Sequence, residues 1–260
     1  MIIKVSIIGA TGFIGKHLAK KITTNCKIKK INLRGEDLSR LKKDTIKKIF
    51  TSDVIINCAA SLNPKTNNDF FLNEHFLNHL LKLNSKFKKK IIHLSSINTL
   101  IHERIDQYTL TKKKSEKKIK NYNNLTIIRL PLVIMREKNI LQPTGNISKL
   151  FDYLKKVKLP IYPMIYPGHL YQPIEIKMLE KEIIKIIFKN KKNKKINLVG
   201  TKKISLWEIF KEIADMEKKK IFKIDLRYIY KIMPKIIKSF IMKQNNFIQQ
   251  IASIDHSKFR

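Results

Sequence analysis

The sequence has little cysteine, which limits its redox and metal chemistry. Only Cys26 and Cys58 occur among 260 residues, too few for a disulfide framework or a multi-thiolate zinc site. Cys58 lies in the apolar run VIINCAA, so we expect both thiols to be reduced packing residues. His75 and His79 are four residues apart, but no Cys/His spacing in the chain fits a metal site. The sequence therefore predicts no metal.

Long apolar runs are also missing. No run approaches the roughly 18 uninterrupted apolar residues that a membrane span requires, so the sequence predicts no spanning helix. The first residues, MIIKVSIIGATG, lack the basic start, apolar stretch and small-residue cleavage site of a secretory signal. We therefore expect a cytoplasmic protein.

Acidic residues are scarce. The chain has 20 Asp and Glu against 55 Lys and Arg, a formal net charge of +35. Such a charge suggests a polyanionic partner, and a basic surface-binding protein for RNA or membrane is one hypothesis. The basic residues are mostly lysines, however, scattered along helices without interleaved aromatic residues, in a chain rich in Ile and Asn. We therefore expect no specific nucleic-acid binding, while anionic substrates are attracted.

Short apolar runs alternate with stretches of helical spacing. The runs are Ile2–Ile8, Val54–Cys58, Ile91–Leu94, Leu125–Arg129 and Ile196–Val199. After the first run, Ile14, Leu18 and Ile22 recur every four residues, as on one face of a helix. This alternation predicts an α/β protein with a Rossmann-like, doubly wound parallel sheet and helices on both faces.

Two parts of the chain depart from regular alternation. Lys29–Arg34 fits a second strand and Asp37 fits the N-cap of a helix through Phe50, but no third strand precedes Val54, so the second βαβ unit is expected to be abbreviated. A helix is expected over 71–81. From about Leu141, proline and glycine punctuate the chain, which predicts a smaller C-terminal lobe.

We therefore expect a Rossmann domain at residues 1–140 and a small lobe at 141–260, with residues 170–205 returning to the sheet. Helices are expected at Met178–Phe188 and Leu206–Met216. Ser205 and Glu208 form the capping-box pattern at the start of the second of these helices.

A glycine motif follows the first strand and opens the first helix. Three of the chain's seven glycines fall within Gly9-Ala10-Thr11-Gly12-Phe13-Ile14-Gly15. A turn this tight and bare lets a pyrophosphate rest against backbone N–H groups at the positive end of a helix. The motif predicts an NAD or NADP site with six contacts, which are Gly9, Thr11, Gly12, Phe13, Ile14 and Gly15. Arg34 ends the predicted second strand, where a cation would meet the 2′-phosphate of NADP, and so favours NADP.

Tyr108 and Lys112 are four residues apart and therefore share a helix face, from which they could together bind a substrate hydroxyl and the nicotinamide ribose of the cofactor. Ser96 ends the segment IIHLSS twelve residues before Tyr108, and Glu116 and then a strand ending in Arg129 follow. This order, together with the glycine spacing GxxGxxG, resembles the extended branch of the short-chain dehydrogenase/reductase superfamily. Within that branch it is similar to the NAD-dependent epimerase/dehydratase (nucleoside-diphosphate-sugar epimerase-like) family.

The resemblance implies that Ser96, Tyr108, Lys112 and Asn73 are the catalytic residues. Tyr108, as phenolate, would take a proton from a sugar hydroxyl while hydride passes to the nicotinamide. The charge of Lys112 would lower the pKa of Tyr108, because a nearby cation favours the anion. Ser96 would hydrogen-bond the same substrate oxygen. Whether the reaction is an epimerisation, a dehydration or a reduction stays open.

The resemblance also implies supporting positions. Asn73 matches a helix Asn that supports the active-site water and backbone. Cys58, Ala59 and Ala60 match the third segment that contacts the nucleotide. The implied substrate is a nucleotide-linked sugar, bound with help from the C-terminal lobe, and a homodimer is left open.

Several departures from the family pattern keep a second interpretation open. Leu100-Ile101 replaces the usual Tyr-Gly, the loop between the catalytic Ser and Tyr is short, and His169 stands where such enzymes aim an Arg at the substrate diphosphate. The alternative is a catalytically inactive dinucleotide-binding scaffold or sensor of the same fold. The basic stretch 228–243 is expected to pack as a helix, with peripheral binding to a membrane as the alternative.

Overall fold

The computed structural model describes residues 2–23, 25–119, 122–156, 161–166, 170–189 and 194–225. It contains two compact units, Met1–Leu130 with Ile176–Leu198, and Pro131–Glu175 with Val199–Arg260. The predictions for His169 and for the stretch 228–243 lie outside the described residues. Among the residues that are described, no helix combines the length and apolar character needed to cross a bilayer.

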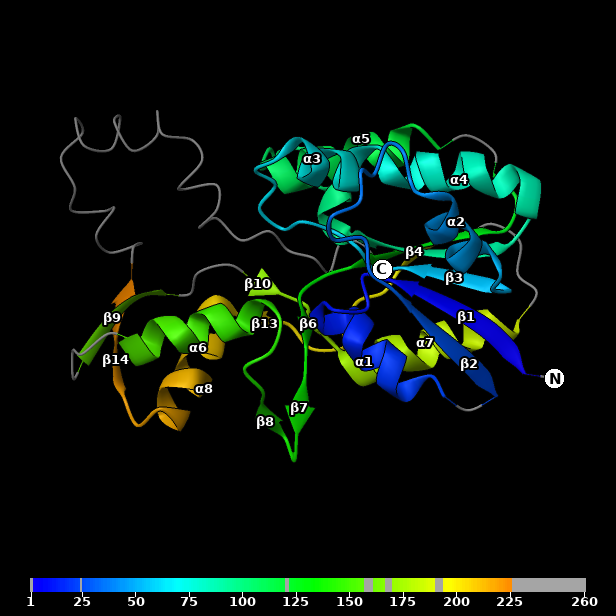
Figure 1. Cartoon of the computed structure of the whole chain (residues 1–260). Coiled ribbons are helices and arrows are strands. Elements are labelled where there is room, and N and C mark those ends of the chain that lie inside the picture. The colour runs from blue at the N-terminus through cyan, green and yellow to red at the C-terminus, as the bar shows by residue number, and fades with distance from the viewer. Residues whose placement is uncertain are drawn as a thin grey trace. The chain divides into compact units, whose positions relative to one another are not determined.

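The first unit is built on a six-stranded parallel sheet (Figure 1). Its strands are β1 (Ile3–Ile8), β2 (Cys26–Ile31), β3 (Val54–Asn57), β4 (Lys90–Ser96), β5 (Leu125–Leu130) and β12 (Lys194–Asn197). They lie in the order β12-β5-β4-β3-β1-β2, and every neighbouring pair is parallel. β3 is buried at all of its residues, as expected for a strand covered on both faces. The predicted α/β, Rossmann-like class is confirmed.

Helices cover both faces of this sheet. On one face lie α1 (Phe13–Lys21) and α7 (Ile176–Phe188), joined by a hydrogen bond of 2.9 Å between His17 Nε2 and Glu180 Oε2. The other face carries α2 (Lys43–Phe50), α3 (Asn67–Glu74), α4 (Phe76–Phe87) and α5 (Gln107–Lys117) (Figure 1). A short 3₁₀ helix, η1 (Ile97–Leu100), follows β4.

The second βαβ unit is abbreviated, as the sequence predicts. α2 leads from β2 directly to β3, and β3 lies on the opposite side of β1 from β2. The winding of the chain therefore reverses between the neighbouring strands β1 and β3. Ligands of open α/β sheets bind at such a reversal, beyond the carboxyl ends of the strands.

Two helix boundaries differ from the sequence prediction. α2 begins at Lys43 because Asp37 caps a local turn instead, its carboxylate accepting from the backbone N–H and the hydroxyl of Ser39 at 2.9 and 2.7 Å. The helix expected over 71–81 is two helices, α3 and α4, which meet at His75. α3 begins earlier than expected because Thr66 and Asp69 form a capping box.

In its described residues, the second unit combines two helices with four strand pairs. The helices are α6 (Asn146–Lys156) and α8 (Leu206–Met216). The strand pairs are β6 (Val133–Ile134) with β11 (Ile174–Glu175), β7 (Arg136–Glu137) with β8 (Ile140–Leu141), β10 (Leu170–Tyr171) with β13 (Ile204–Ser205), and β9 (Ile161–Tyr166) with β14 (Lys220–Asp225). Buried residues of the two helices, among them Phe151 and Ile213, share one hydrophobic core.

The predicted capping box at the start of α8 is confirmed. Ser205 Oγ accepts from the backbone N–H of Glu208 at 3.1 Å, and Glu208 Oε2 accepts from the backbone N–H of Ser205 at 2.6 Å. Two of the otherwise unsatisfied groups at the helix start are thereby hydrogen-bonded.

Candidate active site

The glycine motif forms a tight turn at the end of β1. Gly9 has a φ of +79°, which a side chain would strain, and its carbonyl accepts from the N–H of Gly12 at 3.1 Å. A β-carbon on Gly9 would lie 2.8 Å from the nitrogen of Ala59, and one on Gly15 would lie 2.2 Å from the Gly9 oxygen. Two of the three glycines are therefore required by the packing of the protein itself.

Gly12 is different, because the fold leaves room for a side chain there. Its φ is −75°, and a β-carbon would meet only the Gly9 oxygen, at an ordinary contact distance of 3.5 Å. Gly12 is also the N-cap of α1, without a capping side chain and without an acidic residue in the first turn. This bare helix start fits an anionic group of a ligand. Thr11 beside it is exposed, whereas Phe13 and Ile14 are half-buried.

The loop after β3 lies beside this turn. The N–H of Cys58 donates to Ile8 at the end of β1 at 2.9 Å, and buried Asn57 accepts from the N–H of Ala59 at 3.1 Å. Burial raises the pKa of the Cys58 thiol to about 12, so it is no thiolate at neutral pH. The structure thus brings Cys58 and Ala59 to the glycine turn, and Ala60, the next residue, is exposed.

The prediction that Arg34 ends the second strand is wrong, because β2 runs from Cys26 to Ile31; Arg34 lies three residues beyond its end and is exposed. Its backbone N–H donates to Asn32 Oδ1 at 3.0 Å, and its guanidinium makes no hydrogen bond or ion pair with a described residue. The cationic group is therefore available to a ligand.

Asn73 is a buried residue of α3 that holds the loop after β3. Its Oδ1 accepts from the N–H of Ser61 at 3.0 Å, and its Nδ2 donates to the carbonyl of Ser61 at 2.7 Å. Both ends of the amide are engaged by the backbone. In this arrangement Asn73 positions the loop that carries Ala59 and Ala60.

Ser96, Tyr108 and Lys112 come from β4 and α5. Ser96 ends β4, and its Oγ accepts from the N–H of Asn98 at 3.3 Å as the cap of η1, which contacts α5. Tyr108 lies in the first turn of α5, and Lys112 Nζ lies 6.0 Å from the centre of its ring. Burial and the negative charge of Asp106 raise the pKa of Tyr108 to about 12, against a smaller opposing effect of Arg104.

Lys112 is fully buried, and its ammonium has no hydrogen-bond partner in the described part of the chain. Burial lowers the pKa of Lys112 to about 8, although Glu116 opposes this shift. His93 on β4 is also buried without a partner for either ring nitrogen, and burial together with the charge of Lys112 holds the pKa of His93 well below its usual value. Unsatisfied buried groups are rare in proteins and require an explanation.

The structure adds two sets of residues whose contacts the sequence did not predict. Glu116 accepts from Ser95 Oγ at 2.7 Å and from Arg129 Nε at 3.1 and 3.0 Å. In the sequence, only its position after Tyr108 and Lys112 draws attention to Glu116. Lys113 Nζ donates to the carbonyls of three residues in the loop before α5, which are Ile101 (2.5 Å), His102 (3.2 Å) and Arg104 (3.0 Å). No sequence signal distinguishes Lys113 from the many exposed lysines.

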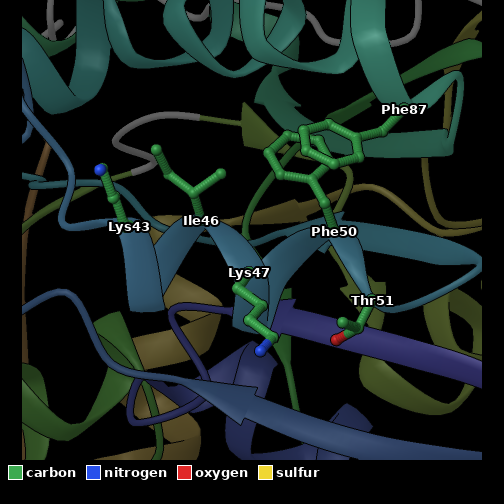
Figure 2. A pocket seen from close by; sticks show the side chains of 6 residues that line it. All are labelled: Lys43, Ile46, Lys47, Phe50, Thr51 and Phe87. Atoms are coloured by element: carbon green, nitrogen blue, oxygen red, sulfur yellow. The ribbon is translucent and has the colours of Figure 1, made fainter.

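A separate groove of about 310 Å³ lies between α2 and the end of α4 (Figure 2). Phe50 and Phe87 stack in it with ring centres 4.4 Å apart, and Lys43 and Lys47 line it. None of the predicted site residues lines this groove. Its surface is apolar apart from ammonium and hydroxyl groups, so it offers no positioned acid/base pair.

Comparisons with known proteins identify the fold. No family model and no curated protein matches the chain. The chain is similar to the solved structure of dTDP-4-dehydrorhamnose reductase from Bacillus anthracis in complex with NADP, with a TM-score of 0.67, 17% identity and coverage of 86% of this chain and 84% of that one. It is also similar to ADP-L-glycero-D-manno-heptose-6-epimerase from Helicobacter pylori, with a TM-score of 0.65, 15% identity and coverage of 86% of this chain and 85% of that one.

A third similar structure is dTDP-glucose 4,6-dehydratase from Bacillus anthracis in complex with NAD, with a TM-score of 0.63, 14% identity and coverage of 86% of this chain and 84% of that one. The three proteins are a reductase, an epimerase and a dehydratase, so one fold serves all three reactions. The chain has this fold, which is the fold that the sequence resemblance implied.

Proposed function

We propose that the protein is an NAD(P)-dependent enzyme of the extended short-chain dehydrogenase type that acts on a nucleotide-linked sugar. The observation that carries the proposal is the buried ammonium of Lys112, which lacks a hydrogen-bond partner among the described residues and lies one helical turn from Tyr108. Such a group destabilises a fold unless something else completes its hydrogen bonds. The ribose hydroxyls of a bound dinucleotide are suitable acceptors.

The glycine turn supports a dinucleotide as that ligand. Gly12 is the position where the protein could accept a side chain and has none, and the free N–H groups at the start of α1 suit a diphosphate. Arg34 would reach the adenine-ribose end of the cofactor, and Cys58–Ala60 would line its other side. The dinucleotide would accept or donate hydride, a reaction that no side chain can perform.

The side chains would handle the proton. Tyr108 is protonated at neutral pH in the free protein, because its pKa is raised to about 12. Lys112, positively charged below about pH 8, would favour the phenolate by its charge and allow Tyr108 to take a proton from a sugar hydroxyl. Ser96 Oγ would donate a hydrogen bond to the same oxygen and stabilise the charge that develops there. The proteins of similar structure include a reductase, an epimerase and a dehydratase, and the proposal covers all three reactions.

Lys112→Met is expected to stabilise the cofactor-free protein. The pKa of Lys112 is lowered from 10.5 to about 8, so the cost of the buried charge is full below about pH 8 and vanishes above about pH 10.5. The shift corresponds to about 3 kcal/mol. Urea unfolding at pH 7 and pH 10 should show the larger gain at pH 7. A variant that is less stable than the wild type at pH 7 contradicts the cost assigned to this charge.

Gly12→Val is expected to leave the protein folded and to weaken dinucleotide binding by at least about 10²-fold, because the side chain enters the space of the diphosphate. Gly15→Val is the contrasting variant, since its β-carbon would lie 2.2 Å from a backbone oxygen and should destabilise the fold itself. Calorimetric titration with NAD and NADP, alongside urea unfolding, separates the two effects. Undiminished affinity in a folded Gly12→Val protein rules out the dinucleotide site.

Arg34→Asp is expected to change cofactor preference from NADP toward NAD. The cation that would pair with the 2′-phosphate is lost, and a carboxylate suited to ribose hydroxyls replaces it. The measurement is the ratio of the two dissociation constants. If that ratio does not change, Arg34 does not contact the adenine ribose.

Tyr108→Phe removes one oxygen and little volume, so cofactor binding should persist while turnover falls by at least about 10²-fold. Turnover is followed by cofactor absorbance and product analysis across a panel of nucleotide sugars. Full activity in the variant overturns the proposed role of Tyr108. If the wild-type protein binds the dinucleotide but converts none of the panel, the scaffold hypothesis replaces the enzyme hypothesis.

A further inference from the structure

Glu116 joins three elements around the predicted site. It lies on α5, one helical turn after Lys112, and only 7% of its side chain is exposed. Its Oε1 accepts from Ser95 Oγ on β4 at 2.7 Å and from Thr99 Oγ1 on η1 at 3.3 Å. The guanidinium of Arg129 on β5 binds both of its carboxylate oxygens.

Two of these contacts are made by residues that flank Ser96 in the sequence. Ser95 precedes it, and Thr99, three residues later, shares its one hydroxyl hydrogen between the Ser96 carbonyl, at the shorter distance of 2.8 Å, and Glu116 Oε1. A single carboxylate on α5 therefore holds the segment that carries Ser96 against the helix that carries Tyr108 and Lys112.

Arg129 extends the network to the next strand. Its side chain is 13% exposed, and its Nη1 donates to Asn197 Oδ1 on β12 at 3.4 Å. A buried ion pair contributes little net stability, because desolvation offsets the attraction, but it fixes the relative positions of the groups it joins. The geometry thus matters more than the energy of the pair.

We infer that Glu116 is a positioning residue, which sets the placement of Ser96 relative to Tyr108 and Lys112; this inference rests on the proposed function. The charge of Glu116 adds a second effect, because it raises the pKa of Lys112 against the desolvation that lowers it. The other ionisable groups linked to Lys112 are Tyr108 on the same helix and His93 on β4.

The test compares Glu116→Gln with the matched control Glu74→Gln. Glu74, on α3, is also largely buried and also pairs with lysines at the C-terminal end of α5, with the C-cap residue Lys118 at 2.8 Å and with Lys114 at 3.5 Å, but it makes no hydrogen bond or ion pair with the described Ser96 segment. Glutamine keeps the shape of each side chain and removes its charge. Urea unfolding and calorimetric titration with the dinucleotide establish that both variants are folded and bind it.

Glu116→Gln is expected to lower kcat at pH 7 by at least about 10-fold, with a smaller change in KM. The basic limb of its pH profile should move to lower pH, since Lys112 loses its proton earlier without the neighbouring negative charge. Glu74→Gln should change neither kcat nor the pH profile. A Glu116→Gln enzyme with wild-type kcat and pH profile overturns the inference, as does an equal loss in both variants.

A second readout does not depend on turnover and separates this inference from the proposed function. Lysine side-chain NMR, with the Lys112 signal assigned by its absence in Lys112→Arg, gives the pKa of Lys112, and hydrogen exchange measures protection of residues 95–104. In Glu116→Gln the pKa should fall and exchange at 95–104 should quicken at least about 10-fold. If the wild type has no turnover, the proposed function fails. In that case the positioning role of Glu116 is supported if Glu116→Gln changes both the pKa of Lys112 and hydrogen exchange at residues 95–104. It is overturned if both quantities match the wild type.

Discussion

Gly9 and Ala59 meet where the winding of the parallel sheet reverses, and a β-carbon on Gly9 would lie 2.8 Å from the Ala59 nitrogen. This close approach requires a residue without a side chain at the end of β1. It also directs the chain into the turn from which α1 starts, so that the N–H groups at the start of α1 lie at the carboxyl edge of the sheet. The geometry of the proposed cofactor region follows from this contact.

Two buried charged groups of α5 differ in their hydrogen bonding. The carboxylate of Glu116 is satisfied by Ser95, Thr99 and Arg129. The ammonium of Lys112, one turn earlier, has no partner among the described residues. The first arrangement fixes geometry, whereas the second leaves hydrogen-bonding capacity for a ligand at a cost in stability.

The high lysine content of the sequence conceals which lysines have distinctive surroundings in the fold. Most lysines in the described part of the chain are exposed, whereas Lys90 and Lys113 are half-buried and Lys112 is buried. Lys90 donates to the last carbonyls of α7, Lys113 holds the loop before α5, and Lys112 is buried without a partner in the described chain. Of these three lysines, Lys112 is the one whose ammonium could still donate hydrogen bonds to a ligand.

The sequence by itself determined the elements whose signals are local: the glycine turn after β1, the abbreviated second βαβ unit and the capping box at Ser205. It did not determine that α2 starts at Lys43, because Asp37 caps a local turn instead, nor that the helix expected over 71–81 divides at His75. Only the tertiary structure decided that Gly12 has free space while Gly15 has none, and that Lys112 alone of its lysine run is fully buried. Free space and burial depend on neighbours distant in the chain, which no local pattern specifies.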